Sequence, residues 1–285
     1  MTRQLNDYST IPTIARLTIH EAQRRRILWV ILLLTLGFLG IYGIGFHYMY
    51  REFNNRSNDS ADLVMIPSAL LIIGLYVTNF LIALMSVLIS VDSISGEIES
   101  HTIDTLVTKP VRRSEIVLGK WLGFAFLLVA FIGLLPGGVM LIAYAIAGIV
   151  VDNFWQGIAL IMLQGLILLS LSLAGGTRLS TLANGALAFM LYGIAFLGSW
   201  IEQIGALFEN ETAVNIGIVT SLIMPTEILW KKALALFQPQ FTSVPVMAGP
   251  FSVASQPSDL MLWYALFFML ALVGLALFSF SNRDL

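Results

Sequence analysis

The sequence predicts an all-α membrane protein with six transmembrane helices. Of its 285 residues, 58% are hydrophobic and only 11% are charged, and the mean hydropathy is +0.86. Soluble globular domains do not have this composition. Apolar runs also recur along the chain at the length of about 20 residues that a helix needs to cross the ~30 Å hydrocarbon layer of a bilayer.

Six apolar runs are long enough to span the membrane, and they leave little sequence for a separate aqueous domain. The predicted spans lie at about residues 27–50, 63–91, 122–151, 156–175, 182–201 and 261–280. The sequence therefore predicts a single transmembrane domain over residues 27–285.

Residues 1–26 predict a cytoplasmic amphipathic helix that lies in the headgroup plane. Ile11, Ile14 and Leu17 are interspersed with charged residues, which is the pattern of an interfacial helix. An ordinary cytoplasmic leader held by the arginines at 24–26 is the alternative.

The distribution of Lys and Arg predicts the orientation, because short cytoplasmic loops carry an excess of both. Placing both termini inside leaves four of the 15 basic residues outside, at Arg51, Arg56, Lys231 and Lys232, and the other 11 inside. The prediction is a multi-pass protein of the cell (inner) membrane with both termini in the cytoplasm.

The segment between the fifth and sixth spans, residues 202–259, is rich in Pro and Glu, and we interpret it as an outer cap. Ile228, Leu229, Leu234 and Leu236 with two neighbouring lysines predict a short interfacial helix in this segment. A re-entrant hairpin is the alternative.

No catalytic, cofactor or metal site emerges from the motifs. Gly119-Lys120 resembles the end of a P-loop, but Ser114 stands in place of the first Gly and Trp121 in place of the Mg²⁺-binding Ser or Thr. The chain has no Cys and three scattered His, so neither a thiolate nor a histidine metal site is expected. The near-neutral balance of charge does not indicate a nucleic-acid partner.

Asn79 and Gln164 are the strongly polar residues within the predicted spans. Either could line a substrate path, although hydrogen bonding between helices is the favoured interpretation. The spans lack ionisable residues, which argues against transport driven by an ion gradient.

The segment from Ser95 to Leu106 is the most informative part of the chain, because it concentrates charge between two apolar runs on the cytoplasmic side. An apolar stripe that includes Ile98 and Leu106 is separated from Glu97, Glu99 and Asp104. This pattern predicts a short amphipathic helix along the membrane, ended by the proline at 110. A solvated loop is the alternative.

These residues resemble the membrane subunits of ABC-2 type exporters, especially the branch known as multicopper-enzyme maturation permeases. The resemblance rests on three stretches, which are residues 14–29, 97–120 and the ending Arg283-Asp284-Leu285. The middle stretch, from Glu97-Ile98-Glu99-Ser100 to Gly119-Lys120, is the specific one, although family members usually carry Gly at the position of His101.

The resemblance implies a permease without an ATPase site of its own. It would form the translocation path with a second permease copy, as a homodimer or with a homologous permease, and would receive a separate P-loop ATPase that binds ATP and Mg. By the family pattern, the residues that couple to this ATPase are Glu97, Ile98, Glu99, Ser100, His101, Thr102, Asp104 and Leu106. An ion-gradient-driven carrier or channel is the alternative function, and a membrane enzyme is disfavoured because no catalytic constellation is present.

Overall fold

The computed structural model describes residues 10–24, 26–56, 60–99, 112–237 and 257–283. Helices dominate these residues, and no strand occurs among them. The fold class predicted from the composition is confirmed.

Six helices are long and apolar enough to cross a membrane, and each corresponds to one of the predicted spans. They are α2 (Arg26–Arg56), α3 (Ser60–Leu88), α6 (Arg113–Ala147), α7 (Phe154–Gly176), α8 (Thr181–Leu207) and α11 (Asp259–Ser281).

Several boundaries of the spans differ from the prediction. The second span ends at Leu88, where the chain turns, rather than at 91. α6 begins at Arg113, before the apolar run itself, and ends at Ala147 because Gly148 takes the left-handed conformation (φ 67°). α8 continues past residue 201 to Leu207 and so includes Glu202.

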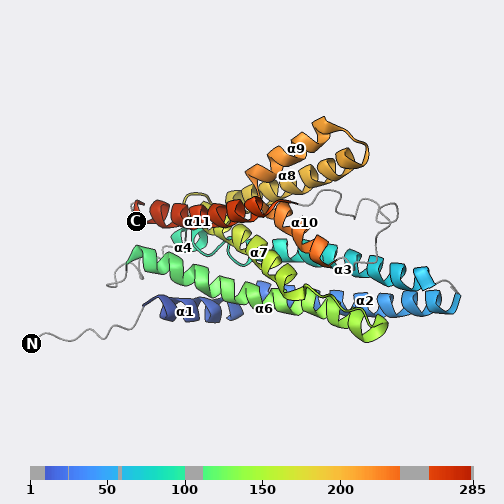
Figure 1. Cartoon of the computed structure of the whole chain (residues 1–285). Coiled ribbons are helices and arrows are strands. Elements are labelled where there is room, and N and C mark those ends of the chain that lie inside the picture. The colour runs from blue at the N-terminus through green and yellow to red at the C-terminus, as the bar shows by residue number, and fades with distance from the viewer. Residues whose placement is uncertain (1–9, 25, 57–59, 100–111, 238–256, 284–285) are drawn as a thin grey trace, which may run out of the picture.

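α7 is the central helix of the bundle. It packs against α3, α6, α8 and α11, and most of its residues are buried. α2 lies at the periphery of the bundle (Figure 1). It exposes large apolar side chains such as Leu33 and Ile41, as expected of a helix that faces lipid.

α1 (Thr10–Arg24) is the helix predicted at the N-terminus, and it packs closely on the first half of α6. A Cβ atom on Gly119 would lie 2.6 Å from Cβ of Ile14, and one on Gly123 would lie 2.8 Å from the carbonyl oxygen of Ala15. Two glycines four residues apart on α6 therefore let the two backbones approach, as in small-residue helix contacts of membranes. Placement in the headgroup plane remains a prediction.

α9 (Glu211–Ile223) and α10 (Thr226–Phe237) follow α8 and meet at a bend of 109°. α9 lies side by side with α8 (Figure 1). Their contact is close enough that a Cβ on Gly198 would lie 1.8 Å from Oγ1 of Thr220. The α9–α10 pair is a broken span or a re-entrant hairpin.

α10 is not an interfacial helix, so that prediction is wrong. Ile228, Leu229 and Leu234 are at most 2% exposed, because α10 packs against α7 and contacts α3, α8 and α11. The apolar residues that suggested a helix on the membrane surface instead contact other helices on most sides. The outer cap remains a prediction, since residues 238–256 lie outside the described residues.

Candidate functional site

The candidate site is the junction around α4 (Ser95–Glu99), the described part of the predicted coupling segment. The chain reaches α4 from α3 through tight turns, in which the Ser93 amide donates to the Ser90 carbonyl (3.0 Å) and the Gly96 amide donates to the Asp92 carbonyl (3.2 Å). A Cβ atom on Gly96 would lie 2.0 Å from Oδ1 of Asp92. The Asp92 carboxylate therefore lies directly against α4, and any larger residue at position 96 would have to displace it.

A buried lysine attaches α4 to α6. Lys120 is 3% exposed, and its Nζ donates to the Ser93 carbonyl at 2.7 Å and forms an ion pair with Glu97. The Glu97 side chain is itself only 14% exposed. Glu97, predicted from the sequence to contact a partner, is therefore held within its own chain.

Hydroxyl and amide side chains attach the same turn to α8. Ser95 Oγ and Thr181 Oγ1 are 2.8 Å apart, and the Thr181 hydroxyl also lies 3.2 Å from Oδ1 of Asp92. One turn into α8, Asn184 donates from Nδ2 to the carbonyls of Ser172 (2.7 Å) and Val91 (3.3 Å). α4 is thus fixed between the beginnings of α6 and α8.

Arginines join the ends of α6, α7 and α11 nearby. Arg283 donates to the Thr177 carbonyl, and Arg178 donates from Nε to Oγ of Ser279 at 2.9 Å. Arg113 donates to the Arg283 carbonyl at 2.5 Å. Arg283, which belongs to the C-terminal stretch that resembles the family, therefore joins helices at the end of the bundle that carries α4. Figure 1 shows α4 near the C-terminus.

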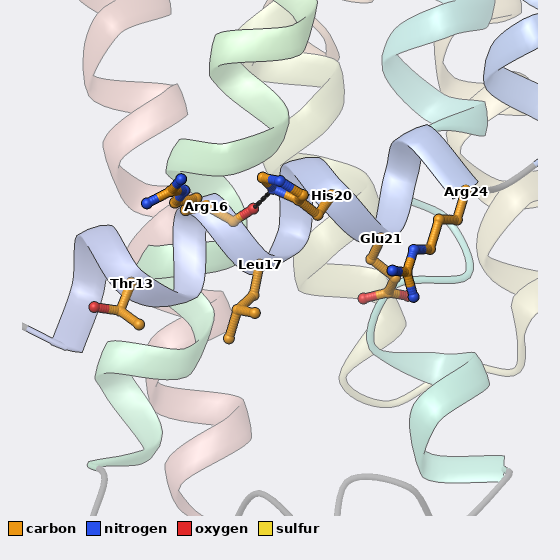
Figure 2. Close-up of a pocket in the computed structure, with 6 residues that line it drawn as sticks. All are labelled: Thr13, Arg16, Leu17, His20, Glu21 and Arg24. Atoms are coloured by element: carbon orange, nitrogen blue, oxygen red, sulfur yellow. Dashed lines mark hydrogen bonds between the residues drawn. The ribbon is translucent and has the colours of Figure 1, made fainter.

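α1 adds an exposed polar face at this end of α6. Figure 2 shows the six side chains that line a shallow pocket on it, Thr13, Arg16, Leu17, His20, Glu21 and Arg24. His20 donates from Nδ1 to the Arg16 carbonyl at 2.9 Å, since a carbonyl can only accept. Basic side chains on an exposed helix face suit an anionic membrane surface.

A second polar cluster lies inside the bundle, and it corrects the prediction that the spans lack ionisable residues. Lys231 of α10 is 3% exposed and forms an ion pair of 2.7 Å with Glu202 of α8. Glu227, one turn earlier on α10, is 1% exposed. Lys231, assigned from the sequence to an outer loop, is buried because α10 folds into the bundle.

Asn79 of α3 and Gln164 of α7 are both buried, as expected of residues inside the bundle. Among the described residues, neither polar atom of the Gln164 side chain has a hydrogen-bond partner, nor does Oδ1 of Asn79. The favoured interpretation of Gln164 as a bridge between helices is therefore not supported. Its place in the translocation path remains a prediction.

The comparison with known proteins identifies the family. The family model described as ABC-2 family transporter protein matches residues 13–285. The chain belongs to the ABC-2 family. It is a multi-pass membrane permease component of an ABC transporter. No curated protein matches it. The match identifies the family and not the branch, so the multicopper-enzyme maturation branch remains a prediction.

Of the coupling residues predicted for this permease, the structure describes the Glu97 side chain and places positions 98 and 99 in α4. Ser100, His101, Thr102, Asp104 and Leu106 lie outside the described residues. Burial of Lys120 was not predicted from the sequence, because this residue was assigned to the end of the cytoplasmic loop. The start of α6 at Arg113 places Lys120 two turns inside the helix.

No group of three or more His, Cys, Asp or Glu residues in the described part of the chain is arranged to hold a metal ion.

Proposed function

We propose that this permease is the membrane-spanning subunit of an ATP-driven exporter, in which a separate P-loop ATPase docks at the α4 end. The observation that carries the proposal is the attachment of α4 to α6 through Lys120 and to α8 through Thr181. A partner that moves α4 would move the beginnings of two spans with it. The residues that follow Glu97, up to 106, would enter a cleft of the ATPase, and the ATP and Mg would belong to that partner.

The division of roles within the segment follows from the contacts of Glu97. Its carboxylate is occupied by Lys120, so Glu97 would transmit movement to α6 rather than bind the ATPase. Docking would then fall to residues nearer the middle of the segment, such as Glu99 and Asp104. Charge-assisted hydrogen bonds of this kind contribute about 1.5–3 kcal/mol each.

A carrier driven by an ion gradient is the second candidate, and one specific observation supports it. Glu202, Glu227 and Lys231 are ionisable and buried, and such residues often lie on ion pathways in membranes. The pairing of Lys231 with Glu202 is equally compatible with a structural role, because each charge compensates the other.

Reconstitution of the full-length chain with its ATPase separates the two candidates. The isolated chain is expected to show no ATP hydrolysis, and the complex is expected to transport substrate only with ATP, in vesicles whose ion gradients have been dissipated. Transport that persists without ATP and stops when the gradient collapses would favour the carrier, and hydrolysis by the isolated chain would refute the proposal.

Substitution within the segment tests docking directly. Glu99→Ala with Asp104→Ala is expected to reduce recovery of the ATPase with the purified permease and to abolish substrate-stimulated hydrolysis. Asp152→Ala is the matched control, because Asp152 is an exposed acid in the loop between α6 and α7, beyond the far end of α6. Equal ATPase recovery in both variants would refute the docking role.

A further inference from the structure

A small cavity lies where α8, α9, α10 and the start of α11 meet, away from α4. Its volume is about 140 Å³, and its walls include Glu202, Ser221, Lys231, Ser258 and Met261. Drug-sized ligands need pockets of about 300–1,000 Å³, so the cavity suits a small polar group.

The polar atoms in the cavity wall carry both signs of charge. Lys231 and Glu202 form a direct ion pair of 2.7 Å. Lysine has three N–H donors and a carboxylate has two acceptor oxygens, so the pair retains binding capacity on both sides. Oγ of Ser221, a residue that is 3% exposed, has no hydrogen-bond partner among the described residues.

These charges restrict the chemistry of a ligand. A purely anionic ligand at Lys231 would add a second negative charge beside Glu202, and a purely cationic ligand at Glu202 would add a second positive charge beside Lys231. Either would leave a buried charge uncompensated, which is strongly unfavourable. A zwitterion instead places its anion against Lys231 and its ammonium against Glu202, so that the charges alternate and the native pair stays intact.

The surroundings of the cavity are apolar and typical of a membrane interface. Ile218 lines the cavity, and its neighbours on α9, Val219 and Leu222, are 57% and 47% exposed. On α11, the exposed Trp263 lies within the first turn and a half of the helix, where aromatic side chains mark the boundary between lipid and water. A head group in the cavity would therefore leave its acyl chains along an apolar surface.

We propose that this cavity binds the head group of a zwitterionic phospholipid with a primary ammonium, such as phosphatidylethanolamine. The phosphate contacts Lys231, and the ammonium donates to Glu202 and to the Ser221 hydroxyl. A quaternary ammonium has no N–H to donate, so phosphatidylcholine is expected to bind less well. The inference does not depend on coupling to ATP.

Lipid retention by the full-length permease tests this assignment. The protein is reconstituted in equal mixtures of phosphatidylethanolamine, phosphatidylcholine and phosphatidylglycerol, stripped with detergent, and its retained lipids are quantified by mass spectrometry. We expect phosphatidylethanolamine to be enriched at least fivefold over each of the other two. No enrichment, or preferred retention of the anionic phosphatidylglycerol, would overturn the proposal.

Two variants and one control locate the site. The first variant, Ser221→Leu, fills the cavity without altering the ion pair. The second combines Glu202→Gln with Lys231→Met and removes both charges together. Each variant is expected to abolish the enrichment. Lys232→Met is the control, because Lys232 pairs with Asp259 and does not line the cavity. Enrichment that survives in Ser221→Leu would refute the location even if the double variant fails to fold.

A water-soluble competitor distinguishes a lipid from a free zwitterion. Glycerophosphoethanolamine has the same head group without acyl chains, and we expect millimolar amounts to leave lipid retention unchanged. Displacement of the retained lipid by this compound would identify a soluble zwitterion as the ligand and overturn the assignment to a lipid.

Discussion

Replacing Lys120 by Met should release α4 from α6 while leaving the rest of the permease folded. Met keeps the length of the side chain and removes the ammonium that pairs with Glu97 and donates to the Ser93 carbonyl. Loss of one partner of a fully buried ion pair costs about 3–5 kcal/mol. Glu97 is 14% exposed at the end of the bundle and can turn toward water, so the lower value of a charge-assisted hydrogen bond applies, about 1.5–3 kcal/mol.

This free energy sets the size of the effect. Since each 1.4 kcal/mol is a factor of ten, the population with α4 detached should rise roughly 10- to 150-fold. The chain contains no Cys, so a single Ser93→Cys substitution at a residue that is 1% exposed provides a specific reporter. The rate of maleimide labelling of this cysteine follows the open population when opening is faster than the reaction.

Two controls distinguish detachment from general destabilisation. Lys232→Met removes a lysine whose partner, Asp259, is 89% exposed, and pairs of this kind contribute about 0–1 kcal/mol, so labelling should not change. Lys120→Met combined with Glu97→Leu removes both charges and should slow labelling again, because no buried carboxylate is left unpaired. Equal labelling rates with Lys120 and with Met at this position would refute the role of the ion pair.

Because α1 packs closely on α6, Gly119→Ala should destabilise the permease by about 1–3 kcal/mol, measured as a lower melting temperature in detergent. Gly133→Ala is the control and should leave the melting temperature unchanged, because the added Cβ meets nothing within 4 Å. The orientation predicts that Gln23→Cys is labelled by a membrane-impermeant reagent only from the cytoplasm and Asp152→Cys only from outside, and the reverse pattern would overturn the assignment. The end of α11 predicts that Arg283→Met increases proteolysis at the α7–α8 turn, because the Thr177 carbonyl loses its donor; unchanged proteolysis would contradict this.

Apolar length was sufficient to predict the spans, because hydrocarbon thickness fixes the number of residues that a helix needs. Each of the six predicted runs is a helix. Apolar length does not predict where a span ends, because polar residues can continue the helix beyond the apolar run. α6 therefore begins at Arg113, and α8 extends to include Glu202.

The failure at α10 has a different cause. Twelve residues with two adjacent lysines have the composition of a surface helix, and burial of Lys231 becomes favourable only when Glu202 lies beside it. That partner is distant in sequence and belongs to the part of α8 beyond the predicted span. Pairing of this kind depends on tertiary structure, so local composition does not reveal it. The Glu97–Lys120 pair was missed for the same reason.

The two ion pairs, Glu97–Lys120 and Glu202–Lys231, fix α4 and the α9–α10 pair of helices in different ways. Around α4, the Glu97–Lys120 pair acts together with hydrogen bonds from Ser95 and to the Ser93 carbonyl, so that α4 is joined to both α6 and α8. These bonds involve Ser93 in the turn before α4 and two residues of α4 itself, so rotation of α4 must displace both spans or break several bonds at once.

The α9–α10 pair of helices is held to α8 by the buried ion pair Glu202–Lys231, in addition to apolar packing. A change in bundle geometry that separated this pair would leave two charges in a site with few alternative partners, so the pair opposes opening at this end. Lipid bound at the hairpin and force applied at α4 would then act on α8 from opposite ends, and the α4 end would be the stiffer of the two.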